Sequence, residues 1–160
     1  MATNKSPWRM NVGGDNKPFR VLLPVAAGSS QAIKRGEICT YSWASDAATP
    51  ASAGNSALVI ADREQKADDK ARMIEFIVPR PDDVFEFDLA SAAAHRLGDT
   101  FAISDSQTLA ASSSNVCARQ AGDDHCPNPS ENDVTRRTKG TAHVLFDPGV
   151  SYWAVINGNS

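Results

Sequence analysis

The chain has 160 residues, of which 41% are hydrophobic and 22% are charged, and its formal net charge is −3. These values are ordinary for a soluble globular protein, and a chain of this size can bury about 70% of its unfolded surface in one core. The small negative charge gives no electrostatic case for binding nucleic acid or an anionic membrane, and no apolar run approaches the roughly 20 residues of a membrane-spanning helix.

The N-terminal residues 1–17 are predicted to form an extended arm. They are polar, contain Gly13-Gly14 and show neither a helical nor a strand period. Trp8, Arg9 and Met10 are the candidate partner-binding residues, because burying an indole against a neighbour gains a large apolar area for few rotamers. A floppy terminus is the alternative. The first residues lack the apolar core of an export signal, so we expect a product that stays in the cytoplasm after synthesis.

Residues 18–156 are predicted to form a single β domain, followed by a tail at 157–160. Apolar residues that alternate with polar ones, or that are β-branched and aromatic, indicate strands. Such runs occur at 18–27, 38–43, 57–61, 73–78, 84–89, 100–103, 116–118, 140–146 and 152–156. Only Ala90 to Arg96 is alanine-rich enough to predict one or two helical turns. The sequence therefore predicts an all-β fold, a small barrel or sandwich with long polar loops.

The two strands at 73–78 and 84–89 are separated by Pro79-Arg80-Pro81-Asp82-Asp83. Prolines cannot join a strand ladder as ordinary members, and aspartates suit a turn. The pair therefore forms either a hairpin or two strands that meet at a tight corner.

A glycine followed by an acid occurs twice at the start of a predicted strand, as Gly36-Glu37 and as Gly98-Asp99. The glycine supplies a backbone conformation that other residues resist, and the acid can accept hydrogen bonds from the turn. A loop of small residues follows each copy, at 44–56 and 105–115, and a short apolar strand follows each loop. This order is a weak internal repeat, for which chance is the favoured explanation and duplication is the alternative.

Two polar segments are predicted to be solvated: the charge run at 62–72 and an insertion at about 119–139. The best candidate metal ligands lie in and just before this insertion, and they are Cys117, Asp123, Asp124, His125 and Cys126. Their spacing lacks the second short-spaced pair of a zinc site, so a polar loop with reduced cysteines is the favoured interpretation, with a Cys117–Cys126 disulfide across the loop as the alternative. His95 and His143 stand alone, and no catalytic motif is present. We expect no catalytic residues, no cofactor and no metal, and therefore a protein that is not an enzyme.

A family resemblance is carried by three stretches: Val59 to Gln65, Phe76 to Phe87, and Leu97-Gly98-Asp99. Together they resemble capsid decoration (cement) proteins of tailed bacteriophages, over roughly residues 22–117. The resemblance implies a β-barrel or β-sandwich on the outer surface of a capsid, where it binds the major capsid protein and stabilises the shell. It also implies a homo-oligomer, with a trimer favoured, and localisation in the virion.

Two other functions remain open. One is a tail or baseplate component of the same virus. The other is a soluble β-sandwich binding module, for example for carbohydrate, which should display exposed aromatic residues clustered on one face. The three tryptophans are spread from position 8 to position 153 in the sequence.

Overall fold

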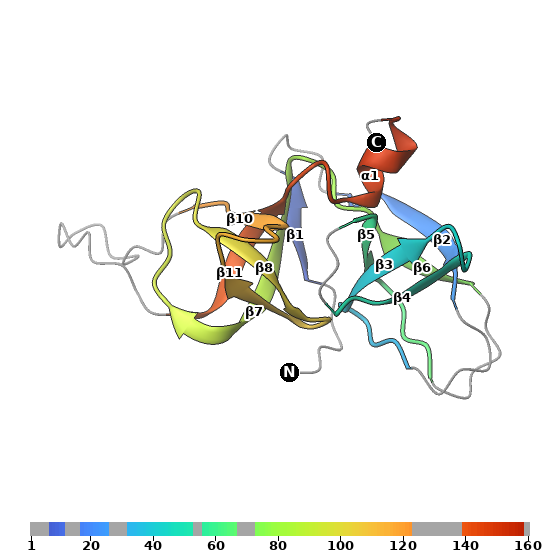
Figure 1. The fold of residues 1–160 in the computed structure, drawn as a ribbon, viewed down its shortest axis with the longest axis horizontal. Coiled ribbons are helices and arrows are strands. Elements are labelled where there is room, and N and C mark those ends of the chain that lie inside the picture. Colours follow the sequence, from blue (N-terminus) through green and yellow to red (C-terminus); the bar gives the residue numbers. More distant parts are fainter. Residues whose placement is uncertain are drawn as a thin grey trace.

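The computed structural model describes residues 7–11, 17–25, 32–52, 56–66, 73–122 and 139–158. Strands make up 52% of the structure and helix makes up 5%, which confirms the predicted all-β class. Ten of the eleven described strands form two five-stranded units that lie side by side (Figure 1), and the remaining strand, β1, adds to the edge of the second unit. One short helix follows the last strand.

The first unit is an antiparallel sheet with the strand order β2-β6-β5-β3-β4. Its strands are β2 (Arg20–Pro24), β3 (Ile38–Ser42), β4 (Ala47–Pro50), β5 (Leu58–Ala61) and β6 (Met73–Ile77). One parallel bridge, between Val25 and Ala48, connects the two edges of this sheet. The sheet is therefore curled to the point at which its edge strands meet.

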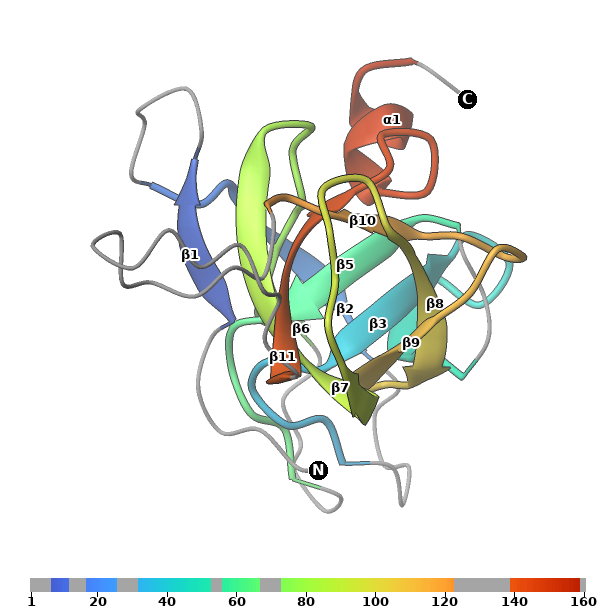
Figure 2. The same cartoon turned by 90° about the vertical axis from the view of Figure 1, so that its left-hand side faces the viewer.

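The second unit is a closed barrel with the order β7-β11-β10-β8-β9 (Figure 2). Its strands are β7 (Asp83–Ala93), β8 (Thr100–Asp105), β9 (Thr108–Ala111), β10 (Ala118–Gln120) and β11 (Lys139–Phe146). A parallel ladder between β7 and β9, at Asp88↔Thr108 and Leu89↔Leu109, closes the ring. The β-barrel predicted from the sequence is thus present in this half of the chain.

The two units have the same strand order, β2 to β6 in one matching β7 to β11 in the other. Their registers match as well. The bridge Val25↔Ala48 corresponds to Leu89↔Leu109 when Gly36 is aligned with Gly98 and the ladders are followed strand by strand. The Gly36 amide donates to the Ala61 carbonyl (2.7 Å) just as the Gly98 amide donates to the Gln120 carbonyl (3.2 Å). The structure therefore contradicts the favoured explanation by chance, because the repeat is real and extends from one turn to five strands.

The acid of each glycine turn closes the turn in the same way. The carboxylate of Glu37 accepts from the amide of Lys34 (2.8 Å), and that of Asp99 accepts from the amide of Arg96 (2.9 Å). In both turns the amide of the acid also donates to the carbonyl three residues back, at 3.1 and 3.0 Å. Asp83 makes the same two bonds to Arg80, with Pro81 at the second position of the turn. The segment between the two central strands is thus a related turn that an acid closes, with Asp82 in place of the positive-φ glycine, and it forms the corner between β6 and β7.

Replacing Gly98 with alanine is expected to lower the free energy of unfolding by about 1–2 kcal/mol, the cost of a left-handed conformation for a residue with a Cβ. Gly98 has a φ of 86°, and a Cβ at this position would meet only open space, so the backbone angle alone sets this cost. Gly36 has a φ of 93°, so the same backbone cost applies to a Cβ there. Gly149→Ala is the matched control, because that glycine also has open space but no positive φ. Equal unfolding midpoints for Gly98→Ala and Gly149→Ala in urea would contradict the prediction.

The prediction of helical turns at Ala90 to Arg96 was wrong. Strand β7 continues through this segment to Ala93, and Lys139 of β11 pairs with Ala93 across an irregularity in the ladder. Alanine has a high helix propensity, but the neighbouring strand offers hydrogen-bond partners that an isolated turn lacks, and such tertiary context overrides propensity.

The strand predicted at 152–156 was also wrong, because these residues form helix α1 (Tyr152–Ile156). Ser151 is its N-cap, and the Ser151 hydroxyl accepts a hydrogen bond from the Trp153 amide (3.1 Å). The same hydroxyl donates to the Pro79 carbonyl (2.6 Å), which fixes the helix start against the corner between the units. A serine cap satisfies an amide that a helix end leaves without an internal partner.

The small-residue loops predicted at 44–56 and 105–115 each contain a strand, β4 and β9 respectively. Alanine and serine gave no alternation that would mark these strands.

The sequence left two alternatives for residues 73–89, a hairpin or two strands that meet at a tight corner. The structure shows the corner, since β6 and β7 belong to different sheets.

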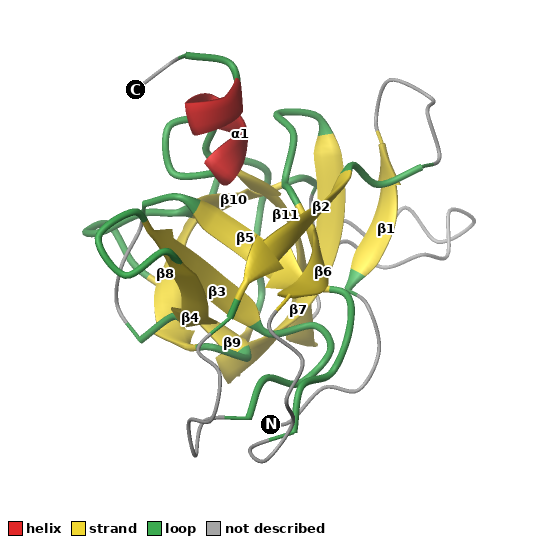
Figure 3. Ribbon diagram, turned by 90° about the vertical axis from the view of Figure 1, so that its right-hand side faces the viewer, coloured by secondary structure: helices red, strands yellow, loops and turns green. Residues whose placement is uncertain are grey.

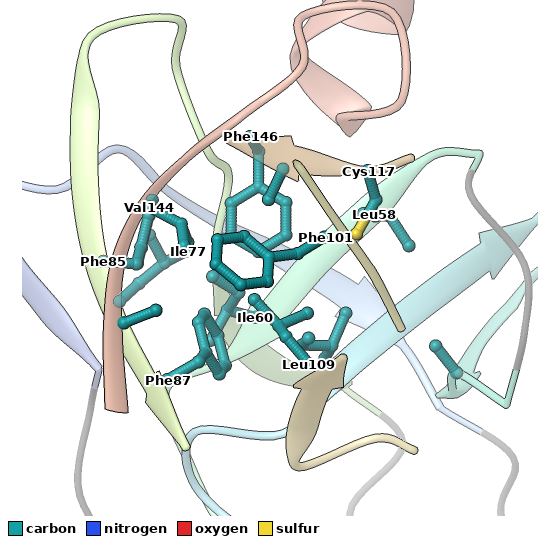
Figure 4. Packing of buried hydrophobic residues seen from close by; sticks show 14 residues of the cluster. Leu58, Ile60, Ile77, Phe85, Phe87, Phe101, Leu109, Cys117, Val144 and Phe146 are labelled. Atoms are coloured by element: carbon teal, nitrogen blue, oxygen red, sulfur yellow. The ribbon is translucent and has the colours of Figure 1, made fainter. Parts of the chain in front are cut away.

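Two hydrophobic clusters fill the structure, and one of them is shared by both units. The buried residues of the barrel pack with four residues of the first unit that face away from its interior. These four residues lie on β3, β5 and β6, and they are Ile38, Leu58, Ile60 and Ile77. Figure 4 shows Leu58, Ile60 and Ile77 among the aromatic rings of the second unit. All four residues of β5 are buried, so both faces of this strand contact apolar groups. The two units therefore bury a common core.

The N-terminal segment does not remain apart from the barrel. Strand β1 (Trp8–Asn11) pairs antiparallel with β7, with Trp8 opposite Phe85 and Asn11 opposite Asp83. The extended conformation agrees with the predicted arm, whereas its pairing with the same chain was not predicted.

Candidate functional site: an aromatic groove beside helix α1

A surface groove of about 630 Å³ lies between strand β3 and helix α1. The residues that line it include Thr40, Tyr41, Ser42 and Trp43 from β3 and the turn after it, Ser56 and Ala57 before β5, and Ser151, Ala154 and Val155 around the helix. Figure 3 shows the helix beside the strands of the first unit. The groove therefore depends on the Ser151 cap, which places the helix there.

Three aromatic rings from the two sides of the groove contact one another. Tyr41 and Trp43 meet edge to face with their ring centroids 4.7 Å apart, and Tyr152 lies 5.6 Å from Tyr41 and 6.1 Å from Trp43. Tyr41 is buried, but Trp43 is 62% exposed. Edge-to-face contacts fix the orientation of a ring beyond what area burial does, so the exposed indole is held in place. Trp43 is thus an ordered apolar surface facing water.

The groove has the chemistry of a binding surface. Its apolar walls are aromatic and aliphatic, and its polar groups include the hydroxyls of Thr40, Ser42 and Ser56. Rigid aromatic anchors ringed by small polar groups are typical of sites that bind another molecule, because a large area is buried with little loss of rotamer freedom.

The Tyr41 hydroxyl donates a hydrogen bond to Asp46, which follows the tight turn after Trp43. This bond, together with burial, raises the pKa of Tyr41 to about 12. The stability that the bond contributes is fully present below the usual tyrosine pKa of about 10, and it is lost as the pH rises through the raised pKa of about 12.

We therefore expect one of the two tyrosines to ionise only near pH 12 when tyrosinate absorbance is followed in the folded protein. The Tyr41→Phe variant should lack that late ionisation. If the substitution instead removes an ionisation near the ordinary tyrosine pKa of about 10, the bond to Asp46 does not control Tyr41.

A second hollow of about 620 Å³ is lined by charged residues of the first unit, which are Arg20, Arg35, Asp62, Arg63, Glu64 and Glu75. The buried carboxylate of Asp62 accepts hydrogen bonds from Arg20 (2.6 Å) and Arg35 (3.3 Å). Arg63 pairs with Glu75 at 3.0 Å. Asp62 and Arg63, which begin the charged segment after β5, therefore belong to a network of ion pairs with Arg20, Arg35 and Glu75.

The structure places Gly36, Glu37, Gly98 and Asp99 in the two turns predicted for them. Glu37 does more than close its turn. Its buried carboxylate also accepts from the Ser106 hydroxyl and the Gln107 side-chain amide, both at 3.1 Å. Ser106 and Gln107 form the turn between β8 and β9, so Glu37 connects the two units.

Trp8, Arg9 and Met10 lie on β1, and their side chains lie outside what the structure describes. The structure does not bring this segment together with the aromatic groove, which lies on the first unit, whereas β1 pairs with the second.

The candidate metal ligands are described only in part. Cys117 and Cys39 are buried, free thiols, and burial raises the pKa of Cys117 to about 12. Residues 123–126 lie outside the described ranges. Within those ranges, no group of three or more histidine, cysteine or acidic side chains is placed to hold a metal ion.

The two histidines of the described segments occupy different environments. His95 is buried with its ring 4.9 Å from that of Phe101, and His143 lies 2.9 Å from the carboxylate of Glu86 at the surface. In the same segments, no helix has the length and hydropathy that crossing a bilayer requires.

The sequence did not predict the cluster of Tyr41, Trp43 and Tyr152, because aromatic residues in predicted strands are usually part of the core. Tyr41 and Trp43 are two residues apart, which places them on one face of an extended chain, and this spacing is the one signal that was available. Tyr152 joins them only because α1 is a helix, whereas the sequence predicted a strand there.

Comparisons with protein-family models, with curated proteins and with solved structures found no match to this chain.

Proposed function

We propose that this chain is a structural virion protein that binds the outer surface of a tailed-bacteriophage capsid and stabilises the shell of major capsid protein. Among the features of the structure, the aromatic groove carries the proposal, because it offers an ordered, exposed tryptophan on a rigid double unit. The resemblance of residues 22–117 to decoration proteins supports the choice of partner.

The construction of the fold agrees with a role under mechanical load. Two five-stranded units share one hydrophobic core, and Glu37 and Ser151 make hydrogen bonds that tie the units and their corner together. A shell under internal pressure can be held by many weak, repeated contacts, provided that each bound module is rigid.

The proposal is tested by mixing the purified protein with empty shells assembled from the major capsid protein of the same phage. We expect the protein to co-sediment with expanded shells and to raise the temperature at which they break. Sedimentation of the shells without the protein, or the same breaking temperature with and without it, would contradict the proposal. Binding to isolated tails instead of shells would favour a tail or baseplate role.

A carbohydrate-binding module is the second candidate function. Tyr41, Trp43 and Tyr152 cluster at one groove, which is the feature that this alternative requires. Aromatic faces can contact the apolar faces of sugar rings, and hydroxyls at the rim can position them. Titration with hexose and N-acetylhexosamine oligosaccharides, followed by tryptophan fluorescence, separates the candidates. Saturable quenching in wild type that is lost in Trp43→Ala would favour the carbohydrate module.

A further inference from the structure

The internal repeat shows a difference between two equivalent strand edges. In the second unit, β1 pairs with the edge of β7 from Asp83 to Phe85, and β9 pairs with the same edge from Asp88 onward. In the first unit, the equivalent strand is β2, whose one bridge to β4 within the described ranges is at Val25. Among the described residues, no strand covers the edge of β2 from Phe19 to Leu22.

The backbone groups along this edge point outward. The Val78 amide donates to the Phe19 carbonyl, so Phe19, Val21 and Leu23 are the residues that bond to β6 in the antiparallel ladder. Arg20 and Leu22 alternate with them and present their amides and carbonyls to the other side. Leu22 is the equivalent of Glu86, whose amide donates to the Pro7 carbonyl at 2.9 Å just before β1. The repeat therefore shows what kind of group fits the open position: the carbonyl of an extended antiparallel chain.

Two side chains beside this edge are apolar and exposed, next to the charged Arg20 and Glu75. Leu22 is 61% exposed and Met73, on the neighbouring strand, is 52% exposed. Met73 pairs with Pro24, two residues from Leu22, so both side chains lie on the same face of the sheet. Exposed apolar side chains next to an unpaired edge are the combination that strand addition uses, since the backbone supplies affinity and the side chains supply specificity.

We propose that the edge of β2 from Phe19 to Leu22 docks an extended, antiparallel segment of the capsid shell protein, with an apolar residue over Leu22 and Met73. The proposal rests on the proposed function, which supplies the partner.

In the register centred on Leu22, a second copy of this chain fits the edge less well. Antiparallel pairing of β2 with the β2 of another copy, centred on Leu22, sets Arg20 opposite Pro24. Proline has no amide hydrogen, so each end of that pair lacks one bond. Strand β1 is already used on β7. An edge strand from a different protein has neither limitation.

The test compares two exposed leucines in shell co-sedimentation. Leu22→Asp puts a charge beside the open edge, and Leu97→Asp puts one at an equally exposed leucine, 68% exposed, in the turn before β8. We expect shell affinity to fall at least about tenfold for Leu22→Asp and to change less than about twofold for Leu97→Asp. Leu22→Asp binding as tightly as wild type would overturn the docking site. Failure of the wild-type protein to bind shells would overturn the proposed function itself, and the docking partner with it.

Hydrogen exchange on the wild-type protein tests the same site without a substitution. The Leu22 amide should exchange quickly in the free protein and at least about tenfold more slowly on the shell, whereas the Val21 amide, bonded to β6, should be protected in both states. An unchanged Leu22 exchange rate in shell-bound protein would overturn the proposal.

Discussion

Replacing Ile60 with alanine should lower the free energy of unfolding by about 2–5 kcal/mol, which is the cost of a cavity in a packed core. Ile60 is fully buried and lies in the cluster that both units share. Because the units bury one core, the variant should still unfold in a single transition, as small cooperative domains do.

The matched control for this variant is Ile156→Ala, at a side chain that is 44% exposed on helix α1. Its cost should stay below about 1 kcal/mol, since large losses of stability come from buried positions. Chemical denaturation followed by far-ultraviolet circular dichroism measures both values. Two separate transitions in Ile60→Ala would mean that the units are independent domains, contrary to the shared core.

Replacing Trp43 with alanine should weaken shell binding at least about tenfold while leaving the unfolding midpoint nearly unchanged. An indole anchor at the centre of an interface contributes about 2 kcal/mol or more, which corresponds to roughly thirtyfold in affinity. The substitution should change the stability of the free protein little, because Trp43 is mostly exposed before binding.

Leu97→Ala is the control for this experiment, because it removes an exposed apolar side chain from the second unit, whereas the groove lies on the first. Equal shell affinity for Trp43→Ala and wild type would remove the groove from the interface. A large drop in the unfolding midpoint of Trp43→Ala would show that the indole is mainly structural.

The sequence predicted the parts of this fold that local patterns determine. Phe85 and Phe87 alternate with acids, so β7 was recognisable directly, and Gly36 and Gly98 marked turns that need a positive φ. These turns suggested a repeat but favoured chance as its explanation, because the equivalent pairs Val25↔Ala48 and Leu89↔Leu109 share little beyond apolar character.

The features that the sequence did not predict depend on contacts between distant segments. Strand β7 extends to Ala93 because β11 pairs with its end there. Tyr152 to Ile156 form a helix because Ser151 caps it against Pro79. The aromatic groove follows from that helix, so an error in one element concealed the site. Tyr41 and Trp43 indicated only a shared face of one strand.

The most direct test of the proposed role is electron cryomicroscopy of shells incubated with the purified protein. We expect added density on the outer surface of the shell that fits two adjoining five-stranded units, with the groove at Trp43 and the edge of β2 turned toward the shell. Bare shells at saturating protein, or added density confined to a tail, would contradict it.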